Sequence, residues 1–346
     1  MTELLTERLR PAVHPTYPRL ICAYLRQAGF DNDTILQDTR LQWAQLLDEH
    51  RFVSIEQLVR LIRRAVELTG KPWVGLEIGK SVSVSAHGSL GYAAVSARDL
   101  REVLKTVSRF IVLRLQVVDV TFEEVGDQCL LRIRETIDLG EAREFLHDAL
   151  LATYFQLVDT ITSQKFRHVR VELPFERPAW AGEYEAVLEC PVVFNAPELC
   201  LSFSAELLDT PCLTADVGIF RSALRDCENQ LKQLDAGGII SQKVSNQFLN
   251  SSGNYPTLDE VAQNLAMSKR TLIRKLKAEG TSFQELLDGM RQELAAWYLL
   301  ETKLPVEQIA ERLGYQDTSN FSRTFRRWFA MSPVEMRRLE NSKGAS

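Results

Sequence analysis

The chain has 346 residues and a formal net charge of −5, with 45% hydrophobic and 25% charged residues. This balance is typical of a soluble globular protein and excludes a disordered chain, and the length predicts two domains. The most apolar stretch, residues 110–120, is too short to cross a bilayer and contains Arg114 and Asp119, so we expect no membrane partner.

The first twenty residues contain Glu3, Glu7, Arg8 and Arg10 and no apolar run, so we expect no secretory signal. The six cysteines form no C-x-x-C pair, and the five histidines lie far apart in the sequence, which argues against a zinc site. We therefore expect a cytoplasmic protein with buried, reduced cysteines, no metal and no cofactor. A thiol sensor is the alternative interpretation of the cysteines.

Residues 1–236 are predicted to form one α+β domain. Apolar residues recur at helical spacing in three segments, over residues 54–68, 99–115 and 141–162. Strand candidates are found at residues 117–125, 128–137, 168–173 and 192–203. Gly126 and Asp127 separate the first two of these strands and predict a hairpin turn.

We expect the domain boundary near Gly237. Loop-forming residues cluster over 233–238 and again over 250–256, and a short helix is predicted between them over 239–249. From Ser241 onward the chain has 15 Lys+Arg and 12 Asp+Glu, a net +3, which leaves −8 on the rest. A basic tail on an acidic body indicates that residues 237–346 alone have a polyanion as partner.

Residues 257–280 have the pattern of a helix-turn-helix unit in an all-α domain. Thr257 and Glu260 have capping-box spacing, and apolar residues then follow at helical intervals. A turn over 266–268 leads to a second helix over 269–278, which ends before Gly280. Leu272 and Leu276 of this helix point inward, and its other face is basic, with Lys269, Arg270, Arg274, Lys275 and Lys277.

The same pattern recurs about 48 residues later, over residues 305–330. Pro305 is expected at the first helical position, and Asp317 is expected to cap the second helix. The apolar stripe of that helix is Phe321, Phe325, Trp328 and Phe329. Its outward residues are Thr318, Asn320, Ser322, Arg323, Arg326 and Arg327.

Residues 283–300 separate the two units and have one apolar face, so we expect a rigid linker helix there. A single helix-turn-helix pattern also fits any small helical bundle, but a doubled pattern with basic second helices favours DNA binding. Major-groove faces recur about every 34 Å along a duplex, so two such helices on one spacer could enter adjacent grooves. The predicted partner is therefore double-stranded DNA.

Residues 309–333, IAERLGYQDTSNFSRTFRRWFAMSP, closely resemble the signature of the AraC/XylS family. Residues 261–283 are similar to that family's first unit, and Arg291, Ala295 and Leu299 are similar to its linker helix. Two positions depart from the family pattern: Ala330 stands where a glycine is usual, and Met336 where an aromatic residue is usual.

The resemblance implies a set of base-reading residues, Arg270, Ile273 and Arg274 in the first unit and Ser319, Asn320 and Arg323 in the second. Arginine can bind guanine and asparagine adenine through two hydrogen bonds, whereas Ile273 could only touch a thymine methyl. The complete predicted DNA-binding set is Lys269, Arg270, Ile273, Arg274, Lys277, Thr318, Ser319, Asn320, Arg323 and Arg327.

The segment HGSLGYAA, residues 87–94, followed by residues 99–104, resembles the sensing domain of the ornithine-utilisation and ToxT-type subgroup of that family. The resemblance implies an arabinose-binding-type domain over residues 1–236 that binds a small effector or dimerises. Gly88, Gly91 and Tyr92 alternatively mark a close-packed helix start. Four arginines could meet an effector carboxylate or form surface ion pairs: Arg109, Arg114, Arg132 and Arg134.

The predicted function is an effector-responsive transcriptional activator, with DNA, a small effector, RNA polymerase and a second copy of the chain as partners. The alternative is a constitutive DNA-binding regulator whose first domain only dimerises. An enzyme is disfavoured, because G-x-S-x-G, H-E-x-x-H and G-x-G-x-x-G are all absent, so we expect no catalytic residue.

Overall fold

The computed structural model describes residues 7–49, 51–163, 166, 168–235, 240–251 and 253–343. The chain forms two compact units, Met1–Ala236 and Gly237–Ser346. The boundary expected at Gly237 and the start of the helix expected at Ile239 lie outside the described residues. Within the described ranges, no helix is both long and apolar enough to cross a membrane.

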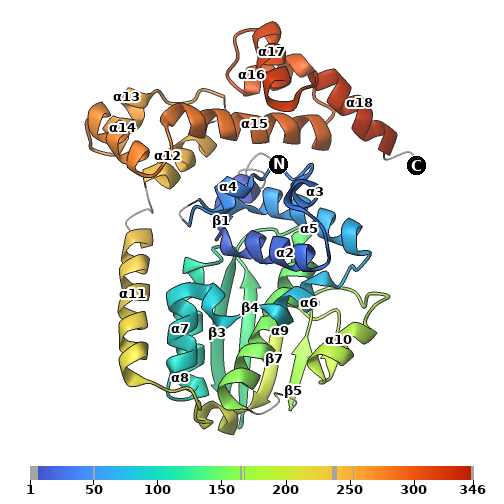
Figure 1. Cartoon of the computed structure of the whole chain (residues 1–346), viewed down its shortest axis with the longest axis vertical. Coiled ribbons are helices and arrows are strands. Elements are labelled where there is room, and N and C mark those ends of the chain that lie inside the picture. Colours follow the sequence, from blue (N-terminus) through green and yellow to red (C-terminus); the bar gives the residue numbers. More distant parts are fainter. Residues whose placement is uncertain are drawn as a thin grey trace. The chain divides into compact units, whose positions relative to one another are not determined.

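The first unit is built on a five-stranded sheet with the order β3-β4-β7-β5-β6 (Figure 1). Its strands are β3 (Val118–Val125), β4 (Gln128–Glu135), β5 (Val169–Glu172), β6 (Val192–Val193) and β7 (Leu199–Ser204). All neighbours are antiparallel except β5 and β6. The predicted hairpin is confirmed, with Gly126 in the left-handed region at φ +64° between β3 and β4. A small second sheet pairs β1 (Pro11–Val13) with β2 (Val53–Ser54).

One predicted strand is wrong, because residues 192–203 form two strands instead of one. Asn195 adopts a left-handed conformation at φ +61°, and Pro197 follows it, so the extended backbone is interrupted between β6 and β7. The two strands therefore occupy different places in the sheet, with β5 between them.

Helices cover the sheets of the first unit. They are α2 (Thr16–Gln27), α3 (Asn32–Leu36), α4 (Trp43–Leu46), α5 (Ile55–Thr69), α6 (Val74–Ser81), α7 (Gly88–Ser96), α8 (Leu100–Phe110), α9 (Ala142–Thr162), α10 (Gly182–Leu188) and α11 (Val217–Asp235), with short 3-10 turns at Val84–His87, Ile111–Leu113 and Ala205–Asp209. The three predicted helices are confirmed as α5, α8 and α9, although α8 ends at Phe110 rather than Leu115. The loop expected from Gln233 is wrong as far as Asp235, because α11 continues to that residue.

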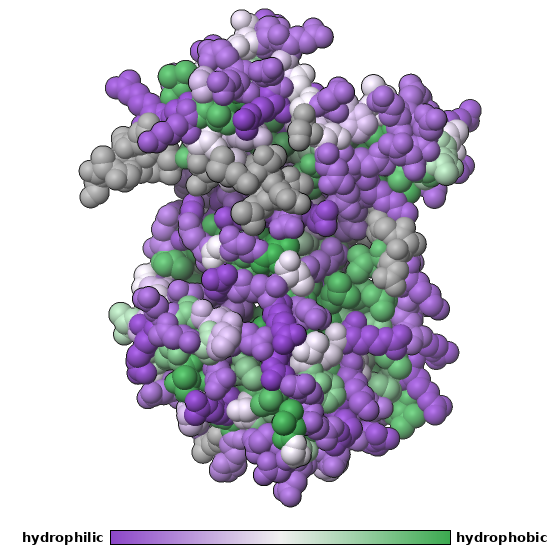
Figure 2. Space-filling model, turned by 180° about the vertical axis from the view of Figure 1, so that it is seen from behind, coloured by the Kyte–Doolittle hydropathy of each residue, from purple (hydrophilic) through white to green (hydrophobic). Residues whose placement is uncertain are grey.

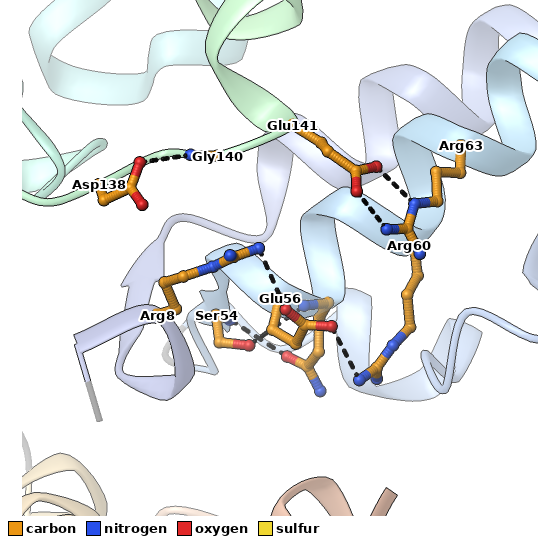
Figure 3. Close-up of polar contacts among 9 residues, drawn as sticks. Arg8, Ser54, Glu56, Arg60, Arg63, Asp138, Gly140 and Glu141 are labelled. Carbon is orange, nitrogen blue, oxygen red and sulfur yellow. Dashed lines mark hydrogen bonds and ion pairs between the residues drawn. The ribbon is translucent and has the colours of Figure 1, made fainter. Parts of the chain in front are cut away.

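Ion pairs hold α5 against the start of α9 (Figure 3). Arg63 donates to both carboxylate oxygens of Glu141, and its Nε lies 2.6 Å from Oε2. Glu56 is buried and accepts hydrogen bonds from Arg8 and Arg60, so its charge is compensated from two sides. Ser54 and Gln57 form the capping box that begins α5. These contacts fix the helix that forms one side of the unit's core.

All six cysteines of the chain are buried and unpaired, as predicted. Burial raises the pKa of the Cys22, Cys129 and Cys227 thiols to about 11. The thiol rather than the reactive thiolate is therefore the stable form at neutral pH.

The second unit consists of helices, and its described residues contain no strand. The helices are α12 (Ile240–Leu249), α13 (Leu258–Asn264), α14 (Lys269–Ala278), α15 (Phe283–Glu301), α16 (Val306–Arg312), α17 (Thr318–Phe329) and α18 (Pro333–Lys343). Figure 1 shows α13 and α14 at one end of α15, and α16 and α17 over its other half. The predicted linker helix is thus confirmed as α15.

Candidate nucleic-acid interface

The first helix-turn-helix unit begins at the predicted capping box. The backbone N–H of Thr257 donates to Glu260 at 2.7 Å, and the Thr257 hydroxyl accepts from the Glu260 N–H. Leu272 and Leu276 of α14 pack into a core with Phe248 of α12. Because these leucines occupy the inner face, α14 presents its remaining faces to solvent.

The outer face of α14 carries the predicted DNA-binding residues of the first unit. Lys269, Arg270, Ile273, Arg274 and Lys277 are all exposed. Ile273 is notable because an aliphatic side chain is 48% exposed in the middle of a basic surface. Lys269 is not a free cation, since its Nζ lies 2.9 Å from Oδ2 of Asp259 on α13.

The second unit repeats this construction. Asp317 caps α17, as predicted, by accepting a hydrogen bond of 2.6 Å from the N–H of Asn320. Phe321 and Phe325 are buried on the inner face. Of the predicted DNA-binding residues, Ser319, Asn320, Arg323 and Arg327 are exposed and Thr318 is half-buried.

Two details of the second unit differ from the prediction. Pro305 is not the first helical residue: its ψ of 150° is extended, so it is the N-cap and α16 begins at Val306. Trp328 and Phe329 are only half-buried, so the apolar stripe of α17 is buried chiefly at Phe321 and Phe325.

Helix α15 contacts both units through its side chains. The guanidinium of Arg291 lies between two aromatic rings, 5.0 Å from Tyr255 before α13 and 5.1 Å from Tyr315 before α17. Near its other end, Tyr298 lies under the guanidinium of Arg312 on α16 at 5.6 Å. With 19 residues at 1.5 Å each, α15 is about 28 Å long, close to the recurrence of the major groove.

Residue 314, in the turn of the second unit, must be glycine. It has φ +72°, and a Cβ there would lie 2.6 Å from the carbonyl oxygen of Gly253. The first unit has Ala266 at the corresponding place, also left-handed at φ +52°. The two units therefore use the same backbone turn with different residues.

The compact unit Met1–Ala236, which is separate from the helix-turn-helix units, contains a cavity of about 550 Å³. Residues from α2, α7, α8, α9, β3, β4 and the 3-10 turn Val84–His87 line it, including Tyr17, His87, Leu104, Leu131 and Tyr154. Sequence reasoning missed the cavity as such, because its walls come from segments far apart in the chain. The one signal was the segment 87–94, which contributes His87, Leu90, Gly91 and Ala94 to the lining.

The close-packed interpretation of that segment also holds. A Cβ on Gly91 would overlap the carbonyl oxygen of Val84, so α7 packs directly on the preceding 3-10 turn. Tyr92 is about half exposed. The glycine thus brings His87 and Ala94 into one wall of the cavity.

Three of the four arginines considered for an effector carboxylate pair with glutamates, and the fourth, Arg114, is buried behind the cavity wall. Arg109 pairs with Glu228 at 3.4 Å, and Arg132 and Arg134 both pair with Glu198, at 2.8 and 2.6 Å. Arg114 is buried, with Nη1 2.8 Å from Nε2 of His14. None of the four is among the described residues that line the cavity.

Residues 29–212 match the family described as the arabinose-binding domain of AraC transcription regulator, N-terminal, and residues 261–339 match a helix-turn-helix domain family. The ornithine utilization regulator of Pseudomonas aeruginosa is 30% identical to the chain over 323 residues, which cover 93% of this chain and 95% of the relative. The chain belongs to the AraC family of transcriptional regulators.

A mycobacterial regulator and one solved structure are also similar to this AraC-family protein over most of its length. An uncharacterized HTH-type transcriptional regulator of Mycobacterium tuberculosis is 28% identical over 331 residues, or 94% of this chain and 96% of the relative. The crystal structure of the transcriptional regulator CdpR from Pseudomonas aeruginosa is 24% identical, covers 93% of this chain and 98% of its own, and has a TM-score of 0.48. The family and its relatives make the chain a DNA-binding transcriptional regulator and not an enzyme.

The surface of the compact unit Gly237–Ser346, which contains both helix-turn-helix units, suits a DNA-binding role. On the face seen in Figure 2, most of its described surface is hydrophilic. The exposed arginines of α14 and α17 can donate hydrogen bonds to base edges and to phosphates.

The two departures from the AraC-family pattern lie at the end of the second helix-turn-helix unit and on the helix that follows it. Ala330 ends α17 in the left-handed conformation, at φ +56°, where glycine would carry no Cβ penalty. Met336 is half-buried on α18. Neither residue belongs to the outer face of α14 or α17.

Proposed function

We propose that this AraC-family regulator is an effector-responsive activator that reads two adjacent major-groove segments with α14 and α17. The observation that carries the proposal is the attachment of both units to one helix of about 28 Å, with Arg291 between Tyr255 and Tyr315. A spacer of this length suits readers one helical turn apart on the same duplex.

Each predicted DNA-binding residue has a role that its chemistry suggests. Arg270, Arg274 and Arg323 would bind guanine, and Asn320 would bind adenine. Ile273 would contact a thymine methyl. The remaining members of the set would bind phosphates: Lys269, Lys277, Thr318, Ser319 and Arg327. Lys269 would have to leave Asp259, and an exposed ion pair of this kind is worth at most about 1 kcal/mol.

In vitro selection of random duplexes by the full chain tests this reading. We expect a two-part motif whose halves have centres about 10 base pairs apart, because each unit reads one face of the groove. The Arg323→Ala variant should lose information in one half only, and Arg274→Ala in the other. Selection of a single short motif would contradict reading by both units.

The cavity of the compact unit Met1–Ala236 favours an effector-responsive regulator over a constitutive one. Concave, mainly apolar cavities of roughly 300–1,000 Å³ are the usual binding sites for small molecules. We propose that effector binding there biases DNA affinity or the assembly of two copies, and that the bound chain recruits RNA polymerase. DNA as the partner supports the predicted cytoplasmic location.

A small-molecule screen tests the effector proposal. Any ligand that binds the folded chain raises its midpoint of thermal unfolding, and an effector must also change DNA affinity. The name of the Pseudomonas aeruginosa relative makes L-ornithine one compound to include. A screen in which no bound compound changes DNA affinity would favour a constitutive regulator.

A further inference from the structure

The walls of the cavity in the first unit are mainly aliphatic. Leu20 and Ile21 come from α2, Leu104 from α8 and Leu150 from α9. Leu131 and Ile133 come from β4, where alternate residues share the face toward the cavity. Aliphatic surface from helices and sheet thus encloses about 550 Å³.

Among the described residues that line this cavity there is no Asp, Glu, Lys or Arg. Most polar groups in the lining already have protein partners. The Thr153 hydroxyl donates to the carbonyl of Gly79 at 3.2 Å, and the Thr160 hydroxyl donates to that of Gln156 at 2.7 Å. Arg114, whose charge acts on Tyr17 and His87, does not itself line the cavity, so a charged ligand would lose its hydration without contacting an opposite charge.

Two residues of the lining each carry a buried polar atom that lacks a partner within the described part of the chain. Nε2 of His87 and the hydroxyl of Tyr154 are buried without a hydrogen-bond partner among the described residues. Nδ1 of His87 lies 3.1 Å from the hydroxyl of Tyr17, which can donate to it and leave the proton on Nε2. Burial lowers the pKa of His87 to about 4, so the ring is neutral at pH 7.

We propose that the cavity binds an uncharged, mainly apolar molecule that carries a hydrogen-bond-accepting oxygen, such as a carbonyl, for Tyr154 or His87. At about 30 Å³ for each water-sized group, the space holds on the order of 18 non-hydrogen atoms. The inference rests on the proposed effector function and names the class of effector. It disfavours charged amino acids and carboxylates, which the lining leaves without a counter-charge.

Three probes of defined charge test this class on the full chain. They are 2-undecanone, which is neutral, decanoate, which has a similar chain with a carboxylate, and L-ornithine, which is charged at both ends. Binding is measured by calorimetry and by the midpoint of thermal unfolding. We expect 2-undecanone to bind at least about tenfold more tightly than decanoate, and L-ornithine not to shift the midpoint.

Substitutions in the lining show whether a probe occupies the cavity. Val107→Trp fills space in the wall and should abolish binding of 2-undecanone, whereas Val125→Trp adds the same bulk at an exposed strand end and should not. Tyr154→Phe removes only the unpartnered hydroxyl and should weaken binding severalfold, while Tyr92→Phe, on the outside of α7, should not. The Tyr154 pair keeps the test decisive if Val107→Trp does not fold.

The outcomes separate the ligand class from the effector function. Binding of decanoate or L-ornithine as tight as that of the ketone, and blocked by Val107→Trp, would overturn the uncharged class and leave the effector function standing. If 2-undecanone binds as expected and DNA affinity does not change, the class stands and the effector function fails. Absence of binding by all three probes would overturn the inference.

Discussion

Left-handed alanines are local strain points in the DNA-binding unit. Ala330 has φ +56° at the end of α17, and Ala266 has φ +52° in the turn before α14. An L-residue with a Cβ pays about 1–2 kcal/mol in this conformation, whereas glycine adopts it freely but loses more chain entropy on folding. The balance at an exposed helix end favours glycine.

We therefore expect Ala330→Gly to stabilise the second helix-turn-helix unit by roughly 0.5–1 kcal/mol. Chemical denaturation followed by tryptophan fluorescence measures the change. Gly314→Ala is the matched opposite, since its Cβ would lie 2.6 Å from the carbonyl oxygen of Gly253, and it should destabilise the unit. A loss of stability in Ala330→Gly would mean that the methyl group of Ala330 makes a contact worth more than the strain.

The outward arginines give the sharpest prediction for DNA recognition. Replacing Arg274 or Arg323 with alanine should cost about 1–3 kcal/mol at the selected site and relax the base preference at one position. Fluorescence anisotropy with the selected and randomised duplexes measures both effects. Arg338→Ala, an exposed arginine on α18, is the control. Equal losses on both duplexes would assign Arg274 or Arg323 to phosphates.

At the scale of elements, Arg291 connects α15 with the loop before α13 and with the turn before α17. Its guanidinium contacts Tyr255 and Tyr315, and each cation–π contact of this type is worth about 0.5–2 kcal/mol. Arg291→Met keeps the apolar stem and removes both contacts. We expect it to weaken binding to the complete two-part site by about tenfold while binding to a half-site changes little.

Comparison of those two duplexes in the same anisotropy assay separates loss of coupling from loss of folding. Lys303→Met, which removes one exposed positive charge just after α15, controls for electrostatics. A proportional loss on both duplexes would show that Arg291 stabilises the unit without setting the distance between the readers.

Helix α9 carries a buried acid whose titration should affect stability. Burial raises the pKa of Asp148 to about 7, although Tyr184 donates a hydrogen bond of 2.6 Å to it and opposes the shift, and Glu144 nearby adds to it. The folded protein then holds a proton that the unfolded chain releases above about pH 4. The stabilisation is complete below that pH, declines as pH rises and is lost above about 7.

Relative to Asp148→Asn, the wild type should therefore lose several kcal/mol of unfolding free energy between pH 4 and 8, at about 1.4 kcal/mol per unit of pKa shift. Burial lowers the pKa of His87 and His147 to about 4, which acts in the opposite direction, but these contributions cancel in the difference. Denaturant titration across pH measures it, with Asp119→Asn on the exposed side of β3 as control. A difference independent of pH would contradict the prediction.

At the scale of the whole molecule, local signals were predictable and long-range ones were not. The bounds of α14 follow from Ser268 and Gly280, which act within a few residues, and the prediction of 269–278 agrees with the structure. The position of β5 between β6 and β7 depends on pairing between distant segments. The cavity combines Tyr17, Leu131 and Tyr154, which no sequence spacing connects.

The candidate DNA surface was predictable for the same reason. Its residues share a helix face, so a period of 3.6 residues separates Leu272 and Leu276 from Arg270 and Arg274. Whether the four arginines bind an effector or pair with other residues could not be decided from the sequence, because a charge in the sequence carries no information about its partner. Arg132 and Arg134 converge on Glu198 only when β4 and β7 pair.

The fixed length of α15 predicts how the molecule tolerates changes in its DNA site. Inserting five base pairs between the two selected half-sites turns one half to the far side of the duplex, because a turn takes about 10–10.5 base pairs. A helix of about 28 Å cannot follow, so binding should fall to that of a single half-site. Ten inserted base pairs restore the facing but roughly double the distance, and they should not restore affinity. Anisotropy with the three duplexes measures this, and recovery at ten base pairs would mean that two copies of the chain, and not α14 and α17 of one copy, occupy the two halves.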